Sequence, residues 1–247
     1  MSKQARSMLD KVALVTGATS GIGRATALRF AEAGAKTFLS GRSSAALRET
    51  AAAIEAHDGE AALRACDLTD PQGADELVAA AVERYGRLDV LVNNAGIGKF
   101  GPADEVSVAD WDLQMTVNLR GVFLCTRAVL PAMKAQNEET GFGGHIVNLS
   151  SAAGLLGNPN MSTYNVTKFG MKGYSDALFK EVRQDGIKVS CFFPGSIQTE
   201  FFDVAGIPIS ANPMTPDQIS STLIHVLETP DNYLITEVVM RPLRPKG

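Results

Sequence analysis

The stretch VALVTGATSGIG, residues 12–23, joins a short apolar run to a glycine-rich turn, and a helical pattern follows it over residues 24–33. The run at residues 12–15 suits a strand that is buried on both faces. Glycines let the backbone approach a phosphate group, and the free N–H groups and dipole of the following helix favour negative charge there. The spacing G-x-x-x-G-x-G differs from the common dinucleotide fingerprint, and a structural turn without a ligand is the alternative. The strand before the turn and the helix after it favour a dinucleotide site.

Strand-like and helix-like segments alternate along the rest of the chain. This alternation predicts a parallel sheet with right-handed crossovers and helices on both faces. Because no linker, charge run or repeat interrupts it, we expect one catalytic domain over residues 1–247. The predicted fold class is α/β, a doubly wound, seven-stranded parallel sheet of the Rossmann type. Strands are predicted at residues 12–15, 36–40, 61–66, 88–92, 145–149, 187–193 and 234–240. Helices are predicted at residues 24–33 and 44–57, from Asp70-Pro71 onward, at 107–136 with a break near Pro131, from Tyr164 to Gly186, and at 216–227.

The composition excludes several classes of function. A formal charge of −4, from 23 Lys and Arg against 27 Asp and Glu, argues against nucleic-acid binding. The N-terminal residues lack the apolar core of a secretory signal, and no apolar run is long enough to span a membrane. Cys66, Cys125 and Cys191 lie far apart in apolar segments, which predicts buried thiols without disulfides and a cytoplasmic protein. The three histidines have no ligand spacing, so no metal site is expected.

The end of the second predicted strand bears on the choice of cofactor. A site selective for NAD places an acidic residue about 20 residues past the glycines, where it binds the ribose 2′-hydroxyl. Here the sequence offers Gly41-Arg42-Ser43 instead. A guanidinium suits a 2′-phosphate by its charge and its fork geometry. Although Arg42 could be an ordinary solvated side chain, the missing acid favours NADP(H) over NAD.

Tyr164 and Lys168 stand four residues apart in a segment with a helical pattern. On a helix such positions share one face, about 5–6 Å apart at Cβ. A nearby positive charge lowers the pKa of a phenol from its ordinary value of about 10 toward working pH. The pair can then give a proton to a carbonyl oxygen or take one from an alcohol. An exposed Tyr/Lys pair on a solvated face is the commonplace alternative, and the dinucleotide signal upstream favours acid–base chemistry.

Three further segments are candidates for the same site. Asn93-Asn94-Ala95-Gly96 follows a predicted strand at the sheet edge where ligands bind, although the asparagines could simply satisfy local backbone groups. Asn118 lies in the middle of a long predicted helix, where a packed, satisfied amide is the alternative. The segment at residues 200–215 is apolar but irregular, which is typical of a mobile flap over a pocket or of an ordinary surface loop. As a flap it would cover about residues 198–215. The flap and its neighbours Lys99, Phe100, Leu155, Leu156 and Asn158 would decide the substrate, and their apolar character suggests a mostly hydrophobic pocket.

Together these features resemble the short-chain dehydrogenase/reductase family, single-domain type, over roughly residues 10–240. Any one motif is weak, whereas all of them in order at strand ends are specific. The resemblance rests on T-G-x-x-x-G-I-G at residues 16–23, N-N-A-G at residues 93–96, Asn118, Ser151 thirteen residues before Tyr164, Lys168, and P-G at residues 194–195.

The resemblance implies catalytic and cofactor-binding residues. Tyr164 would be the acid/base on the carbonyl or alcohol oxygen, and Ser151 would hydrogen-bond that oxygen. Lys168 would lower the pKa of the tyrosine and bind the nicotinamide ribose, while Asn118 would hold a water behind the lysine. The implied cofactor-binding residues are Gly17, Thr19, Ser20, Gly21, Ile22, Gly23, Arg42, Asp67, Leu68, Asn94, Ala95, Gly96, Tyr164, Lys168, Pro194, Gly195, Ile197 and Thr199.

The implied function is NADP(H)-dependent hydride transfer between nicotinamide and a ketone or aldehyde and its alcohol. The C-terminal residues 236–245 lack the glycine pair of ketoacyl-carrier-protein reductases and are similar to carbonyl- and sepiapterin-reductase-like members. A 3-oxoacyl thioester reductase is the alternative within the family. A non-catalytic NADP-sensing protein is a third reading, disfavoured because Ser151, Tyr164 and Lys168 are all kept. The implied partners are a small-molecule substrate and further copies of the chain, as a homodimer or homotetramer.

Overall fold

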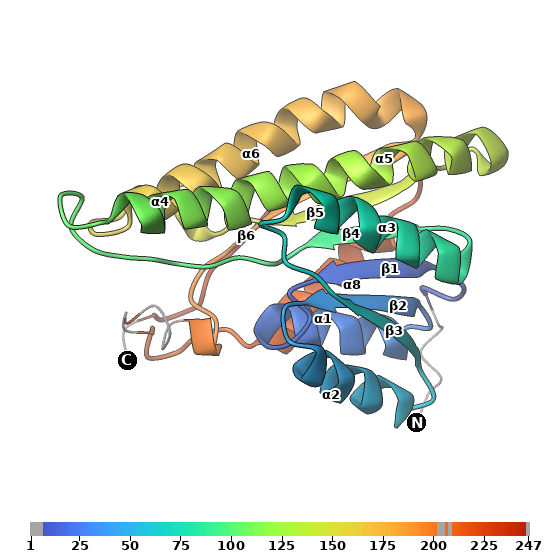
Figure 1. Ribbon diagram of the computed structural model, residues 1–247, viewed down its shortest axis with the longest axis horizontal. Coiled ribbons are helices and arrows are strands. Elements are labelled where there is room, and N and C mark those ends of the chain that lie inside the picture. Colours follow the sequence, from blue (N-terminus) through green and yellow to red (C-terminus); the bar gives the residue numbers. More distant parts are fainter. Residues whose placement is uncertain (1–6, 202–205, 207–208, 246–247) are drawn as a thin grey trace.

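The computed structural model describes residues 7–201, 206 and 209–245, and these residues build one seven-stranded parallel sheet (Figure 1). The strand order is β3-β2-β1-β4-β5-β6-β7, and every neighbouring pair is parallel. The order reverses between β1 and β4, and sheets of this kind bind ligands at the carboxyl ends of the strands at such a point. The predicted fold class is confirmed. The strands are β1 Val12–Thr16, β2 Lys36–Gly41, β3 Glu60–Ala65, β4 Val90–Asn93, β5 Gly144–Leu149, β6 Ile187–Pro194 and β7 Glu237–Met240.

Helices cover both faces of the sheet and enclose two core layers (Figure 1). Side chains alternate along a strand, so Ala13 and Val15 of β1 pack with α1, α2 and α8, whereas Val12 and Leu14 pack with α3, α5 and α6. Every residue of β1 is buried, as predicted for a central strand. The helices are α1 Gly21–Glu32, α2 Ser44–Glu55, α3 Pro71–Tyr85, α4 Val108–Met115, α5 Gly121–Thr140, α6 Ser162–Val182 and α8 Pro216–Leu227.

The long helical region before β5 differs from its prediction. Pro131 does not break it, because α5 runs through this residue from Gly121 to Thr140. Pro131 is on the exposed side of α5, where water can satisfy the carbonyl that the proline ring leaves without a partner. The irregularity lies earlier, in a π-helical turn at Thr116–Arg120 that separates α4 from α5. Asn118 sits in this turn, and such turns often mark functional sites.

The remaining predicted elements are found, with some ends displaced by a few residues. The predicted start of α3 is confirmed, since Asp70 caps the helix and Pro71 opens it. The Tyr164 helix, α6, ends at Val182, and a 3-10 turn at Arg183–Asp185 continues it to Gly186, the predicted end, which has a positive φ of 63°. Strand β4 begins at Val90 rather than at residue 88, because the backbone N–H of Leu88 donates to the side chain of Gln136. The three cysteines are free and buried.

The predicted flap lies partly outside the described residues, which omit residues 202–205 and 207–208. Its two ends are held together, because the backbone N–H of Gln198 donates to the carbonyl of Met214 at 2.8 Å, and that of Met214 donates to Ser196 at 3.0 Å. Among the helices of the described residues, none is both long enough and apolar enough to cross a membrane.

Buried His145 on β5 should make the fold acid-sensitive. Its Nε2 lies 2.8 Å from Ser190 Oγ, and burial, helped by the nearby charge of Lys188, lowers its pKa from 6.5 to about 3. Between these two values the unfolded chain binds a proton that the native protein does not. Stability is therefore lost as pH falls from about 6.5 toward 3, by at most about 1.4 kcal/mol per pH unit for this group.

We expect urea unfolding of the wild type to show a steeper loss of stability between pH 6.5 and pH 5 than unfolding of His145→Gln, by up to about 2 kcal/mol. The variant keeps every other titrating group, so its pH dependence shows how much of the loss of stability comes from the carboxylates. Parallel pH dependences in the two proteins would show that His145 does not resist protonation.

Candidate active site

The turn between β1 and α1 is shaped to receive a phosphate. Gly17 and Gly21 have positive φ angles of 66° and 52°, which residues with a side chain rarely adopt. A Cβ on Gly23 would collide with the carbonyl oxygen of Gly17. Helices α2, α3, α4 and α8 each begin with a side chain that accepts a hydrogen bond from the helix backbone, whereas Ser20 before α1 makes no such bond. The first N–H groups of α1 are therefore available to an anion.

The turn after β4 braces this phosphate site. Asn94 Nδ2 donates to the carbonyl oxygens of Thr16 and Gly17, at 2.9 and 3.2 Å. The hydroxyl of Thr16 accepts from the backbone N–H groups of Asn94 and Ala95, at 3.0 and 3.1 Å. Asn94 thus does satisfy backbone groups, as the alternative interpretation held, and in doing so it joins the carboxyl ends of β1 and β4. Asn93 instead points into the core and donates to Asn148 Oδ1 at 2.8 Å.

Arg42 and Asp67, two of the implied cofactor-binding residues, follow β2 and β3 in the chain. Arg42 and Asp67 are both exposed, and the charge of Arg42 adds to the hydrogen bonds from Thr69 that lower the pKa of Asp67. Thr19 packs against the end of β2, since a Cβ on Gly41 would lie 2.8 Å from its methyl group. The positive side chain of Arg42 and the negative side chain of Asp67 are thus close enough to interact at this end of the sheet. Leu68 packs against Gly121, and Ile22 packs against the core beneath the phosphate turn.

The candidate catalytic residues meet beyond β5. Tyr164 and Lys168 on α6 are only 6% and 4% exposed. Lys168 Nζ donates to the carbonyl oxygen of Leu149 at 2.9 Å and lies 5.6 Å from the centre of the Tyr164 ring. Ser151 follows β5, where its Oγ accepts from the N–H of Ala153 at 3.1 Å and it shares a hydrogen bond with Tyr164. The solvated-face alternative is therefore excluded, because both side chains are buried.

The protonation of Tyr164 differs from the expectation. Burial raises its pKa to about 12, and the hydrogen bond with Ser151 opposes that shift without cancelling it. The net shift thus runs opposite to the lowering expected from Lys168, because burial of the phenol dominates it, and the role of Lys168 stays a prediction. Burial also lowers the pKa of Lys168 to about 8. At neutral pH the phenol is protonated and can act as a proton donor.

Asn118 is fully buried and serves as a brace. Its Oδ1 accepts from the N–H of Ile97 at 2.8 Å, and its Nδ2 donates to the carbonyl of Ile97 at 2.8 Å and to Thr167 Oγ1 at 3.2 Å. Gly96 lies between Asn118 and Lys168, since a Cβ on Gly96 would be 3.4 Å from Asn118 Oδ1 and 3.6 Å from Lys168 Nζ. The amide therefore fixes the loop after β4 close to the lysine, and the water-holding role of Asn118 stays a prediction.

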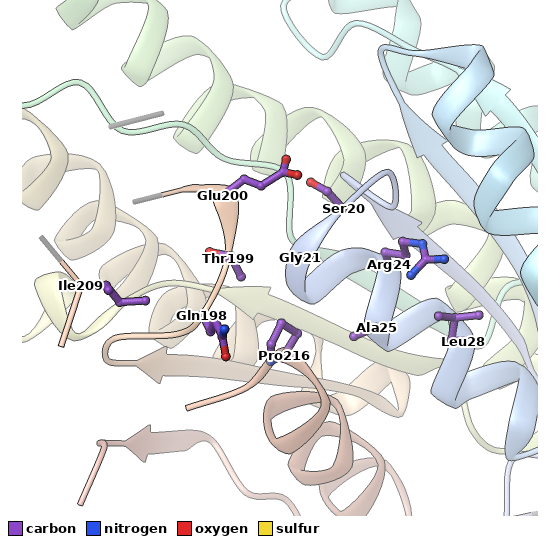
Figure 2. A pocket seen from close by; sticks show the side chains of 10 residues that line it. All are labelled: Ser20, Gly21, Arg24, Ala25, Leu28, Gln198, Thr199, Glu200, Ile209 and Pro216. Atoms are coloured by element: carbon purple, nitrogen blue, oxygen red, sulfur yellow. The ribbon is translucent and has the colours of Figure 1, made fainter. Parts of the chain in front are cut away.

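The segment after β6 closes the cofactor end of the site. Strand β6 ends at Pro194, the N–H of Gly195 donates to Met240 at 2.9 Å, and Ile197 is buried. A Cβ on Gly21 would lie 3.2 Å from the methyl group of Thr199, so this segment reaches the phosphate turn. A cavity of about 560 Å³ lies between them, lined by Ser20 and Arg24 of the α1 side and by Gln198 and Glu200 of the other, and Ser20 points toward Glu200 (Figure 2).

Two phenylalanine rings pack against the ring of Tyr164. Phe100 meets the tyrosine ring edge-on at 5.3 Å between centroids, and Phe201 lies 5.8 Å from the same ring. The two phenylalanine rings are 6.1 Å apart. The wall next to the phenol is thus apolar, in agreement with the hydrophobic pocket that the sequence suggests.

Sequence reasoning missed three buried polar residues that position the loops of the site. Gln114 and Thr163 hydrogen-bond to the backbone of Lys99. Asn165 Nδ2 donates to the carbonyls of Ala153 and Leu156, at 2.6 and 2.8 Å. Two of them flank Tyr164 directly, and Gln114 precedes Asn118 by one helical turn. The sequence could have indicated Thr163 and Asn165, because they are polar residues directly beside a candidate catalytic residue.

A glycine-rich turn before an uncapped helix and a buried phenol at one sheet edge meet the needs of a Rossmann-type oxidoreductase. Comparison with protein families agrees, because residues 11–206 match the model described as short chain dehydrogenase. The chain belongs to the short-chain dehydrogenase family.

Three similar proteins illustrate the range of this family. An oxidoreductase of Thermotoga maritima is 41% identical over 203 residues, which is 82% of this chain and 78% of that protein. A 3-oxoacyl-[acyl-carrier-protein] reductase of Synechocystis sp. is 35% identical over 92% of each chain. The crystal structure of a metagenomic short-chain oxidoreductase in complex with NADP is 36% identical, with a TM-score of 0.84 over 96% of this chain and 99% of the other.

Proposed function

We propose that this protein is an NADP(H)-dependent oxidoreductase that interconverts a ketone or aldehyde with its alcohol, with Tyr164 as the acid/base. The observation that carries this proposal is the buried phenol of Tyr164, hydrogen-bonded to Ser151 and next to Lys168. The glycine turn and the uncapped start of α1, at the same edge of the sheet, fit the phosphates of a dinucleotide.

NADP(H) is the proposed cofactor, and when bound it supplies or accepts the hydride. The turn at residues 17–23 would hold its pyrophosphate, and Arg42 its 2′-phosphate. Asn94 and Thr199 would line the cleft between these ends. Support comes from the exposed guanidinium at the end of β2 and from the NADP complex of the metagenomic relative.

In the direction of carbonyl reduction, the phenol of Tyr164 donates its proton to the carbonyl oxygen. Ser151 donates a hydrogen bond to the same oxygen and stabilises the charge that develops on it. The ammonium of Lys168 stabilises the phenolate left after proton transfer. In this direction the phenol enters the reaction protonated, which its raised pKa allows.

The direct test is NADPH consumption by the purified protein against a panel of ketones, aldehydes, diketones and acyl thioesters, with Tyr164→Phe as the blank. Turnover that vanishes in the blank supports the proposed reaction. Turnover that persists in the blank removes Tyr164 from the mechanism. NADPH binding without turnover on any compound would favour the NADP-sensing alternative.

A 3-oxoacyl thioester reductase is the second candidate, favoured by the similarity to the Synechocystis reductase. The chemistry is the same, and only the group beside the ketone differs. Acetoacetyl-CoA and 2,3-butanedione compared side by side separate the two functions. A much higher kcat/KM for the thioester would make this candidate the better one.

A homo-oligomer is also proposed, with α5 and α6 at the interface. These helices lie side by side in the outer layer (Figure 1) and carry the exposed apolar side chains of Phe123, Val166 and Phe169. Apolar patches on an outer surface often mark protein contacts. A cytoplasmic location is supported by the three free cysteines.

We expect the double variant Phe123→Asp, Phe169→Asp to be monomeric by light scattering under conditions in which the wild type is a dimer or tetramer. Two carboxylates from each chain would have to be buried without partners at the interface, which disfavours association. Leu9→Asp, on the exposed side chain of Leu9 before β1, is the control and should leave the oligomer intact. An unchanged mass for the double variant would place the interface elsewhere.

A further inference from the structure

Gln114 and Thr163 are buried polar residues to which the proposed chemistry gives no role. Gln114 lies on α4 and is 0% exposed, and Thr163 lies in the first turn of α6 and is 7% exposed. A buried amide and hydroxyl are costly to fold unless they are hydrogen-bonded. Their partners therefore show what these side chains do.

The two side chains close a hydrogen-bonded triangle on the backbone of Lys99. Gln114 Oε1 accepts from the N–H of Lys99 at 3.0 Å, and Gln114 Nε2 donates to Thr163 Oγ1 at 2.8 Å. Thr163 Oγ1 in turn donates to the carbonyl oxygen of Lys99 at 3.4 Å. Both polar groups of the Lys99 backbone are thus held from the side, by residues that are 15 and 64 positions away in the chain.

This triangle is continuous with the brace at Asn118. Gln114 and Asn118 are one helical turn apart, and they hold Lys99 and Ile97 respectively. The loop after β4 is therefore pinned at two alternate residues. The residue between them has no room to spare, because a Cβ on Gly98 would lie 2.5 Å from Phe100 Cζ.

The pinned loop carries Phe100, whose ring stands edge-on to Tyr164 at 5.3 Å. At the other end of the triangle, Thr163 is the residue directly before Tyr164. The same hydrogen bonds thus fix both the phenol and the apolar wall beside it. A shift of the Lys99 backbone would move the wall relative to the reacting oxygen.

We propose that Gln114 and Thr163 are positioning residues that hold Phe100 as a fixed wall beside Tyr164 and so set the size of carbonyl substrate that reaches the phenol. The part of this inference that concerns substrate size rests on the proposed function. The restraint itself is a property of the fold and can be measured without turnover.

The experiment compares Thr163→Val, which keeps the shape and loses the hydroxyl, with Thr163→Ser, which keeps the hydroxyl. Gln114→Leu removes the amide independently and serves if Thr163→Val does not fold. Amide hydrogen exchange of the segment around Lys99 should be at least about tenfold faster in Thr163→Val and Gln114→Leu, because each change removes two of the three hydrogen bonds of the triangle. In Thr163→Ser the exchange should be unchanged.

The functional readout is the ratio of kcat/KM for 1-phenyl-1,2-propanedione to that for 2,3-butanedione. We expect this ratio to change at least about fivefold in Thr163→Val and Gln114→Leu, with Kd for NADPH within about twofold of wild type. Because both residues act through one triangle, the double variant should change this ratio little more than either single variant does.

Different failures have different meanings. Unchanged hydrogen exchange at Lys99 would show that the triangle does not restrain this backbone. Faster exchange with an unchanged ratio of kcat/KM values would show that Gln114 and Thr163 have a purely structural role and do not set substrate size. An equal fall in kcat/KM for both diketones would do the same. If the wild type reduced neither diketone, the proposed ketone reduction would fail for these compounds, whereas the exchange data would still decide the restraint.

Discussion

Tyr164→Phe lowers the rate of carbonyl reduction by about 10²–10⁴-fold, the usual contribution of a positioned general acid, and leaves the Kd for NADPH within about twofold. The variant removes a single oxygen from a ring that packs against Phe100 and Phe201. The ring still fills its place, so the phosphate turn and the other residues that would hold the cofactor keep their positions. The expected loss is therefore in kcat rather than in cofactor binding. Stopped-flow NADPH oxidation measures the first quantity and fluorescence titration the second.

The matched control is Tyr174→Phe on the same helix. Tyr174 is also partly buried, and burial raises its pKa too, with a hydrogen bond to Thr126 acting against the shift. It lies away from Ser151 and Lys168, so the loss of its hydroxyl should affect stability and leave the rate nearly unchanged. If the two variants lost activity equally, the effect would be one of folding and Tyr164 would not be the proton donor.

The sheet edge and the residues on it could be predicted from the sequence because position in a parallel sheet follows from order along the chain. Asn94, Ser151 and Ile197 each come directly after a buried strand, so the alternation of strands and helices places them at one edge. The glycine turn is similarly local, since its positive φ angles and its close contacts lie within a few residues. These features needed no knowledge of side-chain packing.

The positioning residues could not be predicted, because their roles depend on packing between distant segments. Gln114 acts on a loop 15 residues earlier and on a helix 49 residues later. The pKa of Tyr164 depends in the same way on how deeply its hydroxyl is buried, which the spacing to Lys168 does not reveal. The π-helical turn at Asn118 was likewise hidden, since Pro131 was the more obvious irregularity in that helix.

Arg42→Ala weakens NADPH binding by about ten- to a hundredfold and NADH binding little, because a charge-assisted bidentate contact contributes on the order of 1.5–3 kcal/mol. The neighbourhood of Arg42 strengthens this expectation. Arg42 lies close enough to Asp67 to help lower the pKa of that carboxyl group. Removing the guanidinium therefore also exposes the 2′-phosphate to an unopposed carboxylate. NADH has no 2′-phosphate and meets neither effect. Titrations with both nucleotides at one fixed ionic strength measure the ratio of the two affinities.

Arg24→Ala is the matched control for the charge itself. Arg24 lines the cavity beside the phosphate turn (Figure 2), at the end of the cleft that both nucleotides share. Its removal lowers the positive potential for NADPH and NADH alike, so the ratio of their affinities should stay nearly constant. Equal losses for the two nucleotides in Arg42→Ala would mean that Arg42 contributes only this general attraction. The choice of NADP(H) would then have to come from the backbone donors at the ends of β2 and β3, because Arg42 would no longer distinguish the two cofactors.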